Sequence, residues 1–257
     1  YIPGALSIFK KIKKLEPGTF MKVNKNGLSI KKYWDLSLIN NKNNPKNFSE
    51  SQLIDQLDDI LLKSVKDRMN SDVKLGAFLS GGIDSSLVVA MMTKLTKDPV
   101  STFTIGFNEK EYDESKDAEA VASFLNTNHY CKYIDEQDLI DLLPVFLDNF
   151  DEPFFDSAAF PTMAVSKLAK KHVSVVMTGD GGDELFGGYH YYKIIRMLGK
   201  FQNLPKNFKN ISSLLTSLIP SHKFKLLGSA FTEDSVSRAF AFSRSIAKDF
   251  NNILFDE

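Results

Sequence analysis

The stretch Ser80-Gly81-Gly82-Ile83-Asp84-Ser85-Ser86 joins two apolar segments of different periodicity. Residues 75–79 (LGAFL) have the pattern of a short buried strand, and apolar residues recur at helical spacing from Leu87 to Leu95. Glycines let a backbone approach an oxyanion, hydroxyl groups add donors, and a helix N-terminus favours negative charge. The stretch is therefore predicted to hold phosphate groups, with contacts from Ser80, Gly81, Gly82, Ser85 and Ser86.

Asp84 places a carboxylate inside this predicted phosphate loop. A carboxylate repels phosphate unless a cation lies between them, and Mg²⁺ prefers carboxylate and phosphate oxygens as ligands. Asp84 is therefore a candidate Mg²⁺ ligand. Other motifs do not fit, because no G-x-x-x-x-G-K-[ST] segment occurs and Phe78 stands where a serine nucleophile elbow requires glycine.

The composition is that of a globular chain without a strong charge bias. Apolar residues make up 43% of the 257 residues, and 32 basic residues balance 32 acidic ones. The balance argues against a nucleic-acid surface, and no apolar run reaches the ~18 residues of a membrane span. The single cysteine, Cys131, fits a reducing cytoplasm, and its strand-like surroundings predict that it is buried.

Strand-like and helix-like segments alternate from residue 75 onward. This order is typical of an α/β fold with a doubly wound parallel sheet, in which ligands bind at the carboxyl ends of the strands. The expected strands are 75–80, 100–107, 129–134 and 173–178. The expected helices are 51–69, 85–96, 114–125, 136–148 and 158–171, followed by a helical appendage over 193–257.

A second glycine-rich stretch follows the last expected strand, with the sequence Thr178-Gly179-Asp180-Gly181-Gly182-Asp183-Glu184-Leu185-Phe186-Gly187-Gly188-Tyr189. The first stretch resembles the SGGxDSS signature of the PP-loop ATP pyrophosphatases. Together the two stretches resemble the synthetase domain of the asparagine synthetase family. The resemblance implies a fold like that of the adenine nucleotide alpha hydrolases, with ATP and Mg²⁺ as ligands.

The resemblance also implies roles for individual residues. Asp183 would complete the Mg²⁺ site with Asp84 and lie near the substrate, and Glu184 would contact the amino-acid substrate. Asp180, at a position where some relatives carry Glu, would handle protons or position ammonia during catalysis. Adenine would be received by Leu79, Ile105 and Gly106, and ATP or pyrophosphate by Thr178 and Gly179.

The implied reaction is the amidation of aspartate. The side-chain carboxylate would attack the α-phosphorus of ATP, and ammonia would convert the β-aspartyl-adenylate into asparagine with release of AMP and pyrophosphate. Two alternatives stay open: an amidotransferase of the same family acting on another carboxylate, such as a sugar acid of polysaccharide synthesis, and a nucleotide-binding module without catalysis. The sequence leaves a homodimer open as well.

Three segments are distinguished by the resemblance. Residues 1–49 resemble the linker that follows the family's N-terminal glutaminase domain, residues 50–192 its ATP pyrophosphatase domain, and residues 193–257 a helical extension of that domain. Neither the catalytic cysteine of the glutaminase domain nor a later E-x-R-x-P-F-L-D segment is found. We therefore expect a piece of a larger enzyme that uses ammonia, or glutamine through a glutaminase partner domain.

Overall fold

The computed structural model describes residues 2, 4–35, 48–152, 154, 156, 158–189, 192, 193 and 196. The chain divides into two compact units, Tyr1–Asp180 and Gly181–Glu257, and the division falls inside the second glycine-rich stretch. Apart from residues 193 and 196, the expected helical appendage over 193–257 lies outside the described residues. The predicted division into 1–49, 50–192 and 193–257 stays a prediction.

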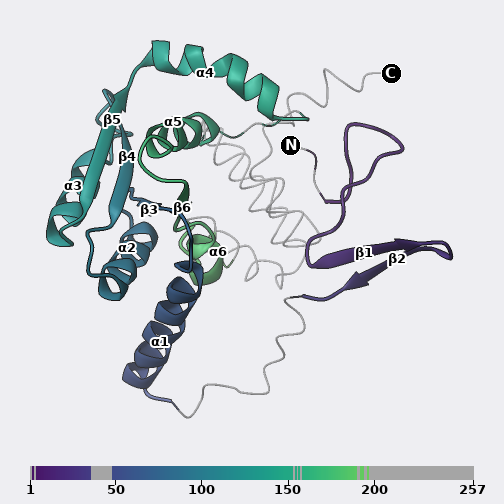
Figure 1. The fold of residues 1–257 in the computed structure, drawn as a ribbon, viewed down its shortest axis with the longest axis horizontal. Coiled ribbons are helices and arrows are strands. Elements are labelled where there is room, and N and C mark those ends of the chain that lie inside the picture. Colours follow the sequence, from purple (N-terminus) through teal and green to yellow (C-terminus); the bar gives the residue numbers. More distant parts are fainter. Residues whose placement is uncertain are drawn as a thin grey trace, which may run out of the picture. The chain divides into compact units, whose positions relative to one another are not determined.

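A four-stranded parallel sheet forms the centre of the first unit (Figure 1). Its strands are β3 (Leu75–Phe78), β4 (Ser101–Phe107), β5 (Asn128–Ile134) and β6 (Val175–Met177), in the order β5-β4-β3-β6. The chain moves outward from β3 to β5 and then returns to β6 on the other side of β3. The strand order therefore reverses between β3 and β6, where ligands bind in folds of this class.

Helices cover both faces of this sheet (Figure 1). One face carries α1 (Glu50–Arg68), α2 (Ile83–Leu95) and α3 (Ser115–Phe124), and the other carries α4 (Glu136–Asn149) and α5 (Ala159–Ala169). Because strand residues alternate between faces, Ala77 packs in the first core and its neighbour Phe78 packs against the second. The predicted doubly wound α/β fold is confirmed. None of the described helices is long and apolar enough to cross a membrane.

The strands and helices predicted between residues 51 and 178 are present, and their ends differ from the prediction by at most two residues. Helix α2 begins at Ile83, earlier than the expected residue 85, because Gly82 already has the extended backbone of an N-cap. Asp84 and Ser85 therefore belong to the first helical turn. Strand β6 has only three residues, whereas the sequence predicts 173–178.

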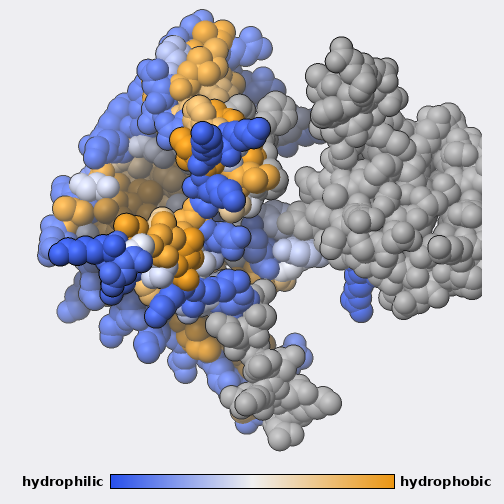
Figure 2. Space-filling view, turned by 90° about the vertical axis from the view of Figure 1, so that its right-hand side faces the viewer, coloured by the Kyte–Doolittle hydropathy of each residue, from blue (hydrophilic) through white to orange (hydrophobic). Residues whose placement is uncertain are grey.

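Helix α1 carries an apolar face that is covered along only part of its length. Leu61 and Val65 pack in the core that α1 shares with α2 and α3. The apolar residues nearer the N-terminus, Leu53, Ile54 and Leu57, are exposed. Helix α4 likewise carries an exposed apolar stripe of Ile140, Leu143 and Leu147. Figure 2 shows such apolar areas, in orange, interrupting the hydrophilic surface.

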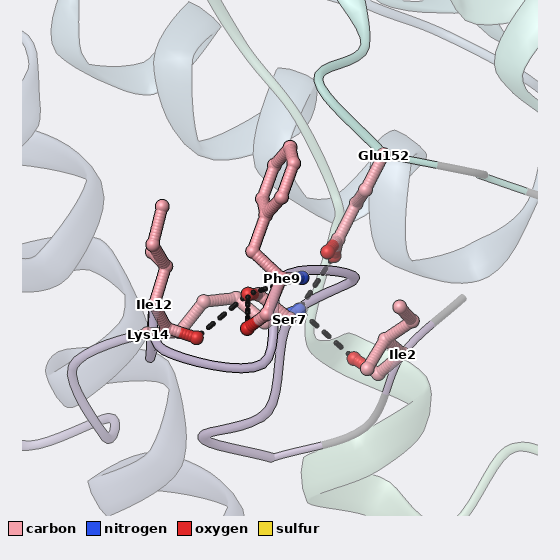
Figure 3. A network of polar contacts seen from close by, with 6 residues as sticks. All are labelled: Ile2, Ser7, Phe9, Ile12, Lys14 and Glu152. Atoms are coloured by element: carbon pink, nitrogen blue, oxygen red, sulfur yellow. Dashed lines mark hydrogen bonds and ion pairs between the residues drawn. The ribbon is translucent and has the colours of Figure 1, made fainter.

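The N-terminal segment contains a hairpin, formed by β1 (Thr19–Asn24) and β2 (Gly27–Lys32). An ion pair links the residues that precede the hairpin to the segment after α4 (Figure 3). Lys14 Nζ donates to Glu152 Oε1 at 2.5 Å and to the backbone oxygen of Ile2 at 2.9 Å. Two parts of the first unit that are distant in sequence are thereby held together.

The predicted burial of Cys131 is wrong, because its side chain is exposed. Cys131 lies in β5, which is one of the two outer strands of the described sheet. A central strand is covered by neighbours on both sides, whereas an outer strand keeps one edge open. The sequence indicates a strand at this position and does not show that the strand is an outer one.

Candidate functional site

The loop between β3 and α2 leaves the helix N-terminus without a side-chain cap. Gly82 is the N-cap residue, with φ −66° and ψ 160°, and a glycine offers no side chain to bond the first N–H groups. A Cβ added at Gly82 would meet only the hydroxyl of Ser80, at 3.2 Å. The start of α2 therefore presents backbone donors and the positive end of the helix dipole, which together favour an anion.

Gly81 fixes the path of this loop. Its φ is +81°, a left-handed conformation that side chains with a Cβ rarely adopt. An added Cβ would lie 2.7 Å from Cβ of Asp117 and 2.8 Å from the backbone nitrogen of Ala118, both in the first turn of α3. Gly81 therefore allows the loop to pack directly on α3.

Two of the predicted phosphate donors bond within the loop itself. The hydroxyls of Ser80 and Ser85 lie 3.0 Å apart, and Ser85 Oγ also accepts from the backbone nitrogen of Ser80 at 3.2 Å. Ser85 Oγ donates to the backbone oxygen of Gly82 at 3.2 Å. These bonds close the loop into a compact turn, so a ligand would have to share or replace them.

Ser86 differs from the other two serines. Its hydroxyl oxygen is buried and has no hydrogen-bond partner among the described residues. A buried hydroxyl without a partner costs roughly 1–3 kcal/mol, so a bound group that satisfied it would be favoured. This orphaned hydroxyl in the first turn of α2 fits the predicted anion site.

The two glycine-rich stretches meet at Gly179. A Cβ added at Gly179 would lie 2.7 Å from the backbone nitrogen of Ser85 and 3.1 Å from Cβ of Asp84. The loop after β6 therefore lies directly against the first turn of α2, at the point where the strand order reverses. Sequence patterns alone gave no sign of this contact, because it joins residues far apart in the chain.

Asp180 follows Gly179 and is exposed, with its carboxylate held by Thr178. Thr178 Oγ1 donates to Asp180 Oδ2 at 2.9 Å and accepts from the backbone nitrogen of Asp180 at 3.4 Å. Thr178 therefore orients the carboxylate for which the family resemblance implies a role in proton handling. Thr178, Gly179 and Asp180 thus lie within the first unit, beside the loop between β3 and α2.

Asp183 and Glu184 belong to the second unit, in the short helix α6 (Gly182–Phe186). Gly188 makes room for Asp183, because a Cβ added there would lie 1.8 Å from Asp183 Oδ1. Glu184 Oε1 accepts from the hydroxyl of Tyr189 at 2.9 Å. The pairing of Asp183 with Asp84 around a metal ion, and the contact of Glu184 with substrate, stay predictions.

The residues assigned to adenine lie in or beside β4. Ile105 and Gly106 are within the strand, and Leu79 donates its backbone N–H to the backbone oxygen of Phe103 at 3.0 Å. The backbone oxygen of Leu79 accepts from the hydroxyl of Thr104, a residue that no sequence motif distinguishes. Thr104 therefore fixes the end of β3 to β4 at the start of the loop.

The donor set at Asp84 fits Mg²⁺. The Asp84 side chain is partly exposed in the first turn of α2, beside the helix N-terminus where phosphate is expected. Among the described residues no three His, Cys, Asp or Glu side chains form a metal cluster. A Mg²⁺ ion held by Asp84, a second carboxylate, phosphate oxygens and water requires no such cluster.

The fold and the loop define a doubly wound α/β protein with a candidate anion site where its strand order reverses. The sequence model described as asparagine synthase matches residues 56–252, and the chain belongs to this family. The chain is 36% identical over 253 residues to a putative glutamine-hydrolysing asparagine synthetase 2 of Methanocaldococcus jannaschii. The aligned region covers 97% of this chain and 48% of that protein. The predicted family is confirmed.

Asparagine synthetase 1 of Bacillus subtilis, also described as glutamine-hydrolysing, is 33% identical over 86% of this chain and 34% of its own length. The chain therefore spans about half of the first relative and a third of the second. Among solved structures, an NMN synthetase of Francisella tularensis aligns with a TM-score of 0.41 at 16% identity, covering 79% of this chain and 96% of that chain. The family assignment rests on the sequences alone.

Proposed function

We propose that the chain contains the ATP-dependent, amide-forming part of an asparagine synthetase. The observation that carries this proposal is the contact of Gly179 with the first turn of α2. This contact brings the start of the second glycine-rich stretch, residues 178–180, beside the uncapped N-terminus of α2. Membership of the asparagine synthase family supports the same reaction.

The loop from Ser80 to Ser86 would bind the β- and γ-phosphates of ATP through the N–H groups that open α2. The side-chain carboxylate of aspartate would attack the α-phosphorus, forming a carboxylate-to-phosphorus bond while the bond to pyrophosphate breaks. Negative charge then develops on the departing pyrophosphate. Preorganised donors at that position stabilise the transition state, which is typically a large part of catalysis.

The residues that would hold Mg²⁺ are Asp84 and Asp183. When bound, the ion would neutralise charge on the phosphates and reduce their repulsion with the Asp84 carboxylate. The position of Asp84 in the first turn of α2, where Gly179 lies against it, supports this role.

The second step is the attack of ammonia on the acyl carbon of the aspartyl-adenylate. The nitrogen loses a proton, and the bond between the acyl group and AMP breaks. Asp180 is exposed at the carboxyl end of β6 and is oriented by Thr178, so its carboxylate can position the ammonia or accept that proton. Glu184 would contact the amino-acid substrate.

Ammonia would come from a glutaminase domain outside the residues that form this fold. The relatives are described as glutamine-hydrolysing and are about two to three times as long as the matched region. Under this proposal, residues 1–49 connect the two domains, residues 50–192 form the synthetase domain in the cytoplasm, and residues 193–257 extend it.

The test is to measure AMP and pyrophosphate formed by the full-length protein from ATP, aspartate and ammonium. We expect aspartate-dependent formation of both products, and a loss of about a hundredfold in turnover for Asp84→Asn. Asp98→Asn is the matched control, because Asp98 is an exposed carboxylate in the turn after α2. Unchanged turnover of Asp84→Asn would contradict the role of Asp84. Pyrophosphate release with another acid, and not with aspartate, would replace the proposed acceptor.

A further inference from the structure

Tyr133 lies at the carboxyl end of β5, directly opposite Gly106 in β4. A Cβ added at Gly106 would lie 2.8 to 3.0 Å from three atoms of the Tyr133 ring. The ring therefore rests against the backbone of Gly106, in space that only glycine leaves free. Gly106 is one of the residues assigned to adenine, so the ring borders the expected position of the base.

The ring is held at its outer end as well. The hydroxyl of Tyr133 lies 2.7 Å from Ser115 Oγ, and Ser115 is only 3% exposed. The backbone nitrogen of Ser115 donates to Asp113 Oδ1 at 3.1 Å, and the same oxygen accepts from the backbone nitrogen of Phe107 at 3.3 Å. Hydrogen bonding by the Ser115 side chain lowers the pKa of Asp113, so this carboxylate remains a charged acceptor.

Although both ends of its ring are held, Tyr133 as a whole residue remains 51% exposed. A buried ring in this position would be explained by packing alone. A ring that is fixed in place and still half open presents a flat apolar surface to a ligand. Adenine has the matching shape, because its π-face stacks well on aromatic side chains.

The ring and the phosphate loop share a support, which is the first turn of α3. Gly81 packs against Asp117 and Ala118, and Tyr133 bonds to Ser115. Residues three apart in a helix are separated by only about 4.5 Å along its axis. The ring and the loop are therefore close enough for one nucleotide to reach both.

We propose that the exposed part of the Tyr133 ring forms a wall of the base pocket and stacks on the adenine of ATP. This inference rests on the proposed function, because it takes ATP as the ligand of the loop. The other contacts of the expected site are backbone groups and phosphate donors. Tyr133 would add a side chain that contacts the base. Ser115 and Asp113 act through Tyr133 by fixing its orientation.

The test compares dissociation constants for ATP and inorganic tripolyphosphate, which has the phosphates and lacks the base, in the full-length protein. Tyr133→Ala is expected to weaken ATP binding about tenfold and to leave tripolyphosphate binding unchanged. Tyr133→Phe keeps the ring and should bind ATP within about threefold of the wild type. Phe124→Ala, which removes an 87% exposed ring at the far end of α3, is the control and should change neither constant.

Tyr133→Leu keeps apolar bulk beside Gly106 and should show the same selective loss, which covers the case in which the alanine variant does not fold. The proposal is overturned if the alanine or leucine variant binds ATP like the wild type, or loses ATP and tripolyphosphate affinity equally. A wild type that binds ATP and releases no pyrophosphate contradicts the proposed function and leaves this test valid. A wild type that binds no ATP overturns both.

Discussion

Gly81 and Gly82 are neighbours in one loop, yet they differ in backbone conformation and in the space around them. Gly81 has φ +81° and lies against the backbone of α3, whereas Gly82 has an ordinary φ of −66° and only one side-chain neighbour. The first glycine is required by the path of the loop, and the second leaves open space beside the start of α2. Their local pattern identifies both as loop glycines, and only the structure separates their roles.

We predict that alanine has different effects at these two positions. Gly81→Ala should lower the free energy of unfolding by at least about 1–2 kcal/mol, because it adds left-handed strain and a contact with Asp117 and Ala118. Gly82→Ala should leave the free energy of unfolding nearly unchanged and weaken ATP binding. Urea unfolding and ATP titration of both variants check this. Equal stability of the two variants would contradict the assignment.

His129 belongs to a polar network at the amino-terminal end of the sheet. Its Nδ1 lies 2.9 Å from Thr102 Oγ1, which lies 2.9 Å from Thr127 Oγ1. Its Nε2 is buried without a partner among the described residues. Burial lowers the pKa of His129 below its ordinary value of 6.5, against an opposing effect of Glu119.

This lowered pKa predicts a loss of stability in acid. The unfolded chain binds a proton at His129 at a higher pH than the folded chain does. The contribution of neutral His129 to the free energy of unfolding is therefore complete above about pH 6.5. It is lost as the pH falls toward the lower pKa of the folded state. His129→Asn, which cannot titrate, should reduce the slope of unfolding free energy between about pH 7 and pH 5. Identical slopes for both proteins would contradict the prediction.

At the scale of elements, helix α1 begins with a capping box. Ser49 Oγ accepts from the backbone nitrogen of Gln52 at 3.3 Å, and Gln52 Oε1 accepts from the backbone nitrogen of Ser49 at 2.9 Å. Ser49→Ala should lower the free energy of unfolding by about 0.5–2 kcal/mol. Ser51→Ala, within the first turn, is the matched control and should have a smaller effect. The comparison is made by urea unfolding, and equal effects would argue against the cap.

The alternation of strands and helices is predictable because local periodicity differs between them. Element ends depend on more distant partners. Strand β6 is short because only Val175 to Met177 pair with β3, and the sequence does not specify that pairing. The apolar stripe of α1 predicts one buried face, yet Leu53 and Leu57 are exposed because the core reaches only the later turns.

For the whole molecule, the sequence predicts which residues form the two glycine-rich stretches and does not predict how they meet. The contact between Gly179 and Ser85 depends on the strand order β5-β4-β3-β6, which places the ends of β3 and β6 side by side. The family resemblance implies a fold of this class, and the strand order is a property of the fold. The exposure of Cys131 shows the limit of a strand pattern alone, because burial depends on the position of β5 within the sheet.

The central claim is that a carboxylate attacks the α-phosphorus of ATP bound at the loop between β3 and α2. The most direct measurement supplies the full-length protein with ATP, ammonium and aspartate labelled with ¹⁸O in its side-chain carboxylate. Attack through the carboxylate leaves one of its oxygens on the phosphate when the amide forms. We predict AMP carrying one ¹⁸O atom per turnover, detected by mass spectrometry. Unlabelled AMP, or ADP in place of AMP, would contradict the claim.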